Sequence, residues 1–93
     1  MMAGVNTLFV GYELNGSGDY SAVREKLAGA SKWWHHLEST WLVVTEQGCD
    51  EYYNELVSCL SPEDKLLVID VTKVTTRWCG FDAVASKWIE DSP

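Results

Sequence analysis

Runs of apolar and alternating side chains divide the first half of the chain into a strand followed by a helix. Residues 7–14 are rich in β-forming side chains and end at the turn signal of residues 15–18, which predicts a first strand. Apolar positions then recur at helical spacing over residues 20–30. Asp19 is a good N-cap residue and Gly29 suits the end of a helix, so this segment predicts an amphipathic helix.

The second half of the chain repeats this order after a hairpin. Residues 32–37 and 40–45 are β-like runs separated by only two residues, which is the spacing of a tight turn. Residues 49–60 have apolar side chains at helical spacing and acids near the start, where the helix dipole favours them. The nearly unbroken apolar run of residues 66–71 predicts a strand covered on both faces.

The tail has a weaker pattern than the rest of the chain. Residues 77–81 are compatible with a short additional strand, and apolar positions over residues 84–89 suggest a last short helix. Asp82 is placed to act as the N-cap of that helix. The tail is therefore expected to add elements to the sheet rather than to form a unit of its own.

The predicted order β-α-β-β-α-β indicates an α+β protein with the ferredoxin-like fold. Two right-handed βαβ units of this kind give a four-stranded antiparallel sheet with both helices on one face. We expect a single domain over residues 1–93, with a core of about residues 6–72 and a short C-terminal extension of about residues 73–93.

Both faces of the predicted sheet carry large aromatic side chains. Because side chains alternate along a strand, Phe9 lies opposite Leu8, and Trp34 lies opposite Trp33. Two helices cover only one face, so the C-terminal extension or a second copy must cover the other. A two-fold homodimer is the simplest cover, and a monomer closed by its own tail is the alternative. The residues expected at an interface are Phe9, Trp34, Trp41 and Trp78.

The charge of the chain changes which partners are expected. Seven Lys and Arg against fourteen Asp and Glu give a net charge of -7, whereas a protein that grips phosphates needs a basic surface. General nucleic-acid binding is therefore disfavoured, although folding can still gather a small local basic patch. A basic protein is the expected class of partner, by electrostatic complementarity.

Three cysteines without a CxxC spacing fit a reducing compartment better than a disulfide framework. Residues 1–4 show no charged segment followed by an apolar one, and no stretch approaches the roughly 18 apolar residues of a membrane span. The sequence therefore predicts a cytoplasmic protein that does not enter the membrane.

Three segments resemble a known family. They are FVGYELN at residues 9–15, WWHHLESTW at 33–41 and DKLLV at 64–68. They are similar to the small bacterial and phage proteins labelled SinR-like. That group resembles, more distantly, the ferredoxin-fold CRISPR-associated protein of the spacer-acquisition complex and the VapD-type toxin ribonucleases. The resemblance covers residues 6 to about 81, and the second segment is its most specific part.

The distant relatives imply a metal site at the end of the first strand. In them an Asp ends that strand, and the two copies of a dimer meet there to hold a metal ion for phosphodiester cleavage. The matching position here is Glu13, so the resemblance implies paired Glu13 carboxylates around Mg²⁺. A glutamate binds Mg²⁺ through oxygen, but its extra methylene moves the carboxylate relative to an aspartate.

Two further features are candidates for chemistry. His35 and His36 are adjacent on a strand and point to opposite faces, so at most one belongs to a site, and His36 is the candidate acid or base. A hydrogen-bonded structural histidine is the simpler alternative. Residues 15–18 precede a capped helix and are either a plain turn or a backbone cradle for a phosphate. Asp70 is a second acid of a site or a charge that protects an edge strand.

Two functions follow from these patterns. The first is a small homodimeric acidic module, non-catalytic, that regulates or binds a partner in a nucleic-acid defence or phage counter-defence setting. The alternative is a metal-dependent endoribonuclease with paired Glu13 carboxylates at the dimer interface, in which Mg²⁺ activates water.

Overall fold

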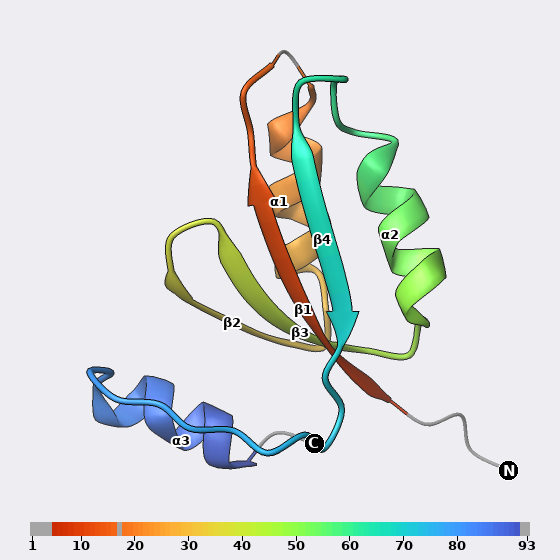
Figure 1. Cartoon of the computed structure of the whole chain (residues 1–93). Helices are drawn as coiled ribbons and strands as arrows, with labels where there is room; N and C mark the ends of the chain where they lie inside the picture. Colours follow the sequence, from red (N-terminus) through yellow and green to blue (C-terminus); the bar gives the residue numbers. More distant parts are fainter. Residues whose placement is uncertain (1–4, 17, 92–93) are drawn as a thin grey trace, which may run out of the picture.

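The computed structural model describes residues 5–16 and 18–91. These residues form one four-stranded sheet and three helices (Figure 1). The order β-α-β-β-α-β is followed by a C-terminal helix, so the predicted α+β, ferredoxin-like architecture is confirmed. The elements are β1 Asn6–Glu13, α1 Tyr20–Ala28, β2 Lys32–Leu37, β3 Thr40–Thr45, α2 Cys49–Val57, β4 Lys65–Asp70 and α3 Ala83–Asp91.

The sheet has the strand order β2-β3-β1-β4, and each neighbouring pair is antiparallel. The first strand is central, and Phe9 lies opposite Leu42 of β3 and opposite Ile69 of β4. Because opposed residues in a ladder share a face, this register places the even-numbered side chains of β1 on one face and the odd-numbered ones on the other.

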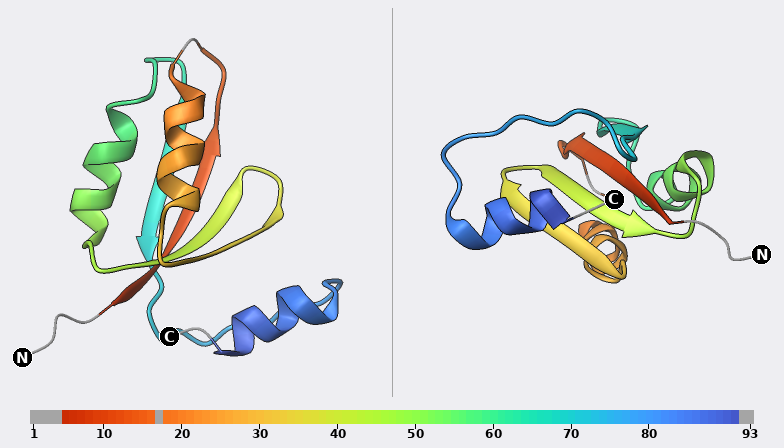
Figure 2. Two further views of the ribbon diagram at one scale, coloured as in Figure 1. Left: turned by 180° about the vertical axis from the view of Figure 1, so that it is seen from behind. Right: turned by 90° about the horizontal axis from the view of Figure 1, so that it is seen from below.

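Helices α1 and α2 cover the face that carries Leu8 and Val10. The view from behind shows both helices across the sheet, while α3 lies apart from them (Figure 2). The helices contribute the apolar positions that their 3.6-residue spacing predicts, and the sheet contributes alternate positions. The buried residues of this core are Leu8, Val10, Val23, Leu27, Trp41, Val43, Tyr52 and Leu56.

Two helix starts are fixed by the aspartates expected from the sequence. The Asp19 carboxylate accepts a hydrogen bond from the amide of Ala22 at 3.1 Å. Likewise, Asp82 accepts from the amide of Ala85 at 2.9 Å, at the start of α3. Each satisfies an amide that the first turn of a helix leaves without a partner, so the two predicted N-caps are confirmed.

The C-terminal extension differs from its prediction in one element. Residues 77–81 form no strand. Residues 71–82, which we call the strap, are also outside the strands, although the Val71 amide donates to the Thr7 carbonyl of β1 at 2.8 Å. At the start of the strap Lys73 has φ +58, a left-handed conformation that interrupts an extended strand. The strap leads to α3, which is held beside β2 where the Trp34 indole donates to the Ala85 carbonyl at 3.1 Å.

The last strand also differs from expectation. The apolar run in β4 predicts a strand covered on both faces, but β4 is the edge strand of the sheet. Leu67 is 56% exposed and Ile69 is 43% exposed. The apolar run suits burial of both faces of β4, but within this chain α2 covers only one of them.

No helix within the described ranges 5–16 and 18–91 is both long enough and apolar enough to cross a membrane. The turn residue Ser17 and the N-terminal residues 1–4 considered above lie outside these ranges.

Candidate functional site

Glu13 lies at the end of β1, as expected, and is paired within its own chain. Its carboxylate is 3.1 Å from the ammonium of Lys65, its neighbour across the β1–β4 ladder. Hydrogen bonds from Lys65 and Asn15 lower the pKa of Glu13 from its ordinary value. Both members of the ion pair are exposed, at 60% for Glu13 and 76% for Lys65. The carboxylate is therefore ionised and already has a cation beside it.

The described part of the chain holds no group of three His, Cys, Asp or Glu residues placed to bind a metal ion. The expected Mg²⁺ at Glu13 therefore depends on a second copy of the chain and stays a prediction. If it is correct, the purified protein cleaves mixed RNAs with Mg²⁺ or Mn²⁺, does not cleave with EDTA, and loses activity in Glu13→Ala. A folded protein that cleaves no RNA in either metal contradicts it.

The two histidines point to opposite faces of β2, as predicted. His35 stacks on Trp41 at 4.1 Å between ring centroids, and its Nδ1 lies 2.9 Å from the Thr40 carbonyl. Since a carbonyl only accepts, Nδ1 is the protonated nitrogen and His35 is a packed, hydrogen-bonded residue. His36 lies beside Trp34 on the other face. His36 is on β2 and Glu13 is on β1, with β3 between them in the sheet. Among the described residues, the two side chains form no hydrogen bond or ion pair with each other.

The predicted interface aromatics are divided between the core and the surface. Trp41 is 1% exposed inside the core, and Trp34 is 3% exposed beneath α3. Little of either ring is exposed in the single chain, and their assignment to an interface stays a prediction. Trp78 is half-buried, and its indole donates to the Ser86 hydroxyl at 3.2 Å within the C-terminal extension. Phe9 lies on the sheet face that α1 and α2 leave uncovered, and it shares this face with Trp34 beneath α3.

We call this uncovered surface over β1 and β4 the open face, and in Figure 1 it is turned toward the reader. A Cβ atom added at Gly11 would lie 3.0 Å from the ring of Phe9, so the ring lies over the glycine. The aromatic ring therefore packs over the backbone of Gly11, beside the exposed side chains of β4. The open face consists of Phe9, Gly11 and Glu13 of β1 with Lys65, Leu67 and Ile69 of β4.

The open face is electrically neutral in a chain of net charge -7. Its one acid and its one base form the Glu13–Lys65 ion pair. The helices on the opposite side carry exposed acids, of which Glu55 forms an ion pair with Lys26 at 2.7 Å. The other exposed acids of this helical side are Glu25, Glu46, Asp50 and Glu51. The open face is therefore apolar and neutral, whereas the helical side carries several exposed acids together with the exposed Tyr53 and Val57 of α2.

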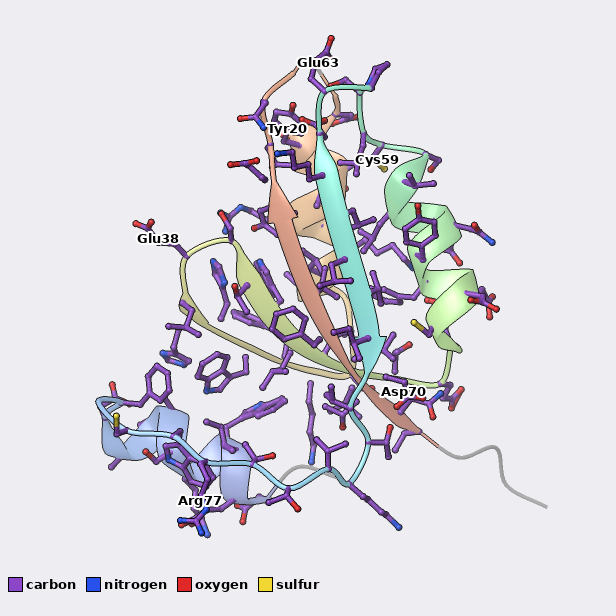
Figure 3. All side chains as sticks on the ribbon, viewed as in Figure 1. Tyr20, Glu38, Cys59, Glu63, Asp70 and Arg77 are labelled. Carbon is purple, nitrogen blue, oxygen red and sulfur yellow. The ribbon has the colours of Figure 1, made fainter. Side chains whose placement is uncertain are left out.

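The residue that sequence reasoning missed is Asp64, in the turn between α2 and β4. Its Oδ1 accepts from the amides of Asn15 and Gly16 and from the Tyr20 hydroxyl, at 2.7, 3.0 and 2.7 Å. Its Oδ2 accepts from the amide and hydroxyl of Ser61 at 2.8 and 3.0 Å. The loops meet at the end of the molecule where Tyr20 and Glu63 are labelled in Figure 3.

This carboxylate changes the interpretation of the loop at residues 15–18. Partial burial raises the pKa of Asp64, but hydrogen bonds from Tyr20, Ser61 and Asn15 outweigh it and hold the pKa well below its usual range. Asp64 is thus an anion bound by the amides that a phosphate would use. The phosphate-cradle alternative is wrong for these amides, and the loop is a structural turn.

Comparison with known proteins finds no family model, no curated protein and no solved structure that matches the chain. The functional evidence is therefore the shape and charge of the protein's own surfaces. Two arrangements are distinctive: the neutral apolar open face, and an acidic helical side behind it.

Proposed function

We propose that this protein is a homodimeric, non-catalytic interaction module whose two copies meet through the open face. The observation that carries the proposal is the exposure of Leu67 and Ile69, at 56% and 43%, beside the ring of Phe9 over Gly11. A contiguous apolar surface of this kind marks a contact with another molecule. The resemblance to SinR-like proteins supports a nucleic-acid defence or phage counter-defence setting.

A second copy is the occupant that best fits the charge of this surface. Two copies of a chain with net charge -7 repel each other through most of their surfaces. The open face avoids this repulsion because Glu13 and Lys65 neutralise each other. Closed two-fold contacts use the same patch on both copies. A patch without net charge does not repel its own copy, so the open face can pair with itself. A chain of 93 residues also gains stability from an added partner.

Pairing through the open face leaves the helical side of each copy pointing outward. The dimer then carries twice the net charge of -7, and α2 with the turn before it presents four acids of each copy, Glu46, Asp50, Glu51 and Glu55. Such a surface complements a basic protein and favours fast, salt-sensitive association. Binding to a basic protein partner, including occupation of a nucleic-acid-binding groove, is the role that we infer for this side.

Leu67→Asp is expected to convert the dimer into a monomer. The substitution places a charge in the middle of an apolar contact, where the one base of the open face, Lys65, is already paired with Glu13. Because Leu67 is exposed in the single chain, the fold itself should be retained, as circular dichroism will show. Light scattering should give twice the chain mass of 10.4 kDa for the wild type and 10.4 kDa for the variant.

Val84→Asp is the matched control for this experiment. Val84 is 76% exposed on α3, outside the open face, so its replacement adds the same charge without touching the proposed contact. This variant should remain dimeric. A wild-type particle of 10.4 kDa at high concentration, or dissociation caused equally by both substitutions, would contradict the proposal.

A further inference from the structure

The strap and α3 enclose a groove against the lower part of the sheet. Its volume is about 760 Å³, within the range of sites that hold small organic ligands. Leu42 and Val74 contribute apolar walls, and Thr75 and Thr76 contribute hydroxyl groups. A smaller hollow of about 410 Å³ lies on the other side of Trp88, which lines both. Arg77 marks this region in Figure 3, at the opposite end of the molecule from Tyr20.

Basic residues gather around these two hollows, although the chain as a whole is acidic. Lys73 and Arg77 line the groove, and Lys32 and Lys87 line the smaller hollow. These are four of the seven Lys and Arg residues of the chain. Only two of its fourteen acids line the same two hollows. The two acids are Glu90, and Asp91, which forms an ion pair with Lys87 at 3.4 Å.

Tryptophan rings lie among these cations. Trp78 lines the groove, and its indole N–H donates to Ser86, which fixes the orientation of the ring. Trp33 is 45% exposed and lines the smaller hollow. Fixed aromatic rings offer stacking surfaces to flat heterocycles, and neighbouring cations offer charge to phosphates. This combination of rings and cations occurs at sites that bind nucleotides or short single strands.

We propose that the groove binds nucleotides, with the base against Trp78 and the phosphate at Lys73 and Arg77. A phosphate ion alone makes no use of the rings, and an uncharged apolar ligand makes no use of the two cations. A long duplex extends past the groove onto the acidic remainder of the surface, which repels it. A mononucleotide or a short single strand remains within the basic region. The groove borders the open face, because its Leu42 lies opposite Phe9 in the β1–β3 ladder, but none of its lining residues belongs to the open face. The two cations and Trp78 that it uses come from the strap of a single copy.

Isothermal titration calorimetry at low salt tests the proposal with defined probes. AMP, UMP and a ten-nucleotide single-stranded RNA are compared with tripolyphosphate, which has charge only, and with uridine, which has a base only. We expect the nucleotides to bind at least about tenfold more tightly than either comparator, since both parts of the groove are used. Tighter binding of the RNA than of UMP places further nucleotides in the smaller hollow, and equal binding confines the ligand to the groove.

Matched charge variants locate the binding. Lys73→Gln with Arg77→Gln should weaken nucleotide binding by about tenfold or more, because charged hydrogen bonds to the phosphate are lost. Arg24→Gln removes another exposed cation, on α1, which lines neither the groove nor the smaller hollow, and should leave the affinity unchanged. The absence of saturable binding by any nucleotide overturns the proposal. So does equal binding of tripolyphosphate, or equal affinity in the double variant and the wild type.

Discussion

Trp41→Ala is expected to lower the free energy of unfolding by about 3–5 kcal/mol. The ring is 1% exposed and lies between the sheet and the helices. It stacks on His35 at 4.1 Å, and its indole N–H donates to the Tyr12 hydroxyl at 3.0 Å. Alanine leaves a cavity and a hydroxyl without its donor. Because domains of this size are stable by only about 5–15 kcal/mol, urea unfolding followed by circular dichroism will show the loss clearly.

Trp33→Ala is the control, because it removes the same kind of side chain from the neighbouring strand β2, on the same face of the sheet as Trp41. Trp33 is 45% exposed, and its ring contacts Trp41 at 5.1 Å between centroids. Its loss should cost about 1 kcal/mol, since much of the ring is already in water. Equal losses from the two substitutions would contradict the core position of Trp41. If Trp41→Ala instead dissociates a dimer without loss of stability, the predicted position of Trp41 at an interface is supported.

The order of the elements could be predicted because each one carries its own period in the sequence. Alternate positions such as Leu8 and Val10 define a strand, and residues such as Val23 and Leu27 define the inner side of a helix. The ends were less exact for a physical reason. Helix α2 stops at Val57 instead of residue 60, because the chain continues as tight turns with amides bonded three residues back.

The faces of the sheet could not be assigned from the same patterns. Trp34 and Trp41 are equally apolar in the sequence, and alternation alone does not say which face the helices take. In the structure Trp41 lies under α1 and α2, while Trp34 lies under α3 at the other face. The two rings therefore belong to two packed layers, and the surface left for a partner is the neighbouring one over β1 and β4.

Contacts between distant loops are the part of the candidate sites that local patterns cannot predict. Asn15 and Asp64 are 49 positions apart, and nothing in either segment names the other as its partner. The glycine-rich turn did signal free amides suited to an anion. What the sequence did not reveal is that the anion is a side chain of the same protein. A similar limit applies to the groove and the smaller hollow, whose four cations together come from three separate segments.

Asp64→Asn is expected to cause a larger fall in Tm than any other replacement of an acid by its amide in the described chain. An asparagine has one acceptor oxygen, and its NH₂ group would face N–H and O–H donors whichever way the amide is turned. The amides of Asn15, Gly16 and Ser61 cannot all keep their bonds. Asp70→Asn is the control, because Asp70 accepts two hydrogen bonds, from the amide and hydroxyl of Thr72, whereas Asp64 accepts five. Similar Tm losses in the two variants would contradict this role of Asp64.

The pH dependence of the same variant separates the charge of Asp64 from its shape. The pKa of Asp64 lies well below its usual 3.8, because the hydrogen bonds to its ionised form outweigh burial. A carboxyl with a depressed folded pKa stabilises the protein fully above its unfolded pKa. That stabilisation is lost as pH falls below about 4, because the unfolded chain then binds the proton more readily. The difference in Tm between the wild type and Asp64→Asn should therefore be constant from about pH 7 to 5 and shrink toward pH 2.

The wild type will still lose some stability in acid after this contribution is removed, since Glu13, Glu55 and Asp70 also have lowered pKa values. A difference in Tm that stays unchanged down to pH 2 would mean that the geometry of the side chain matters and its ionisation does not.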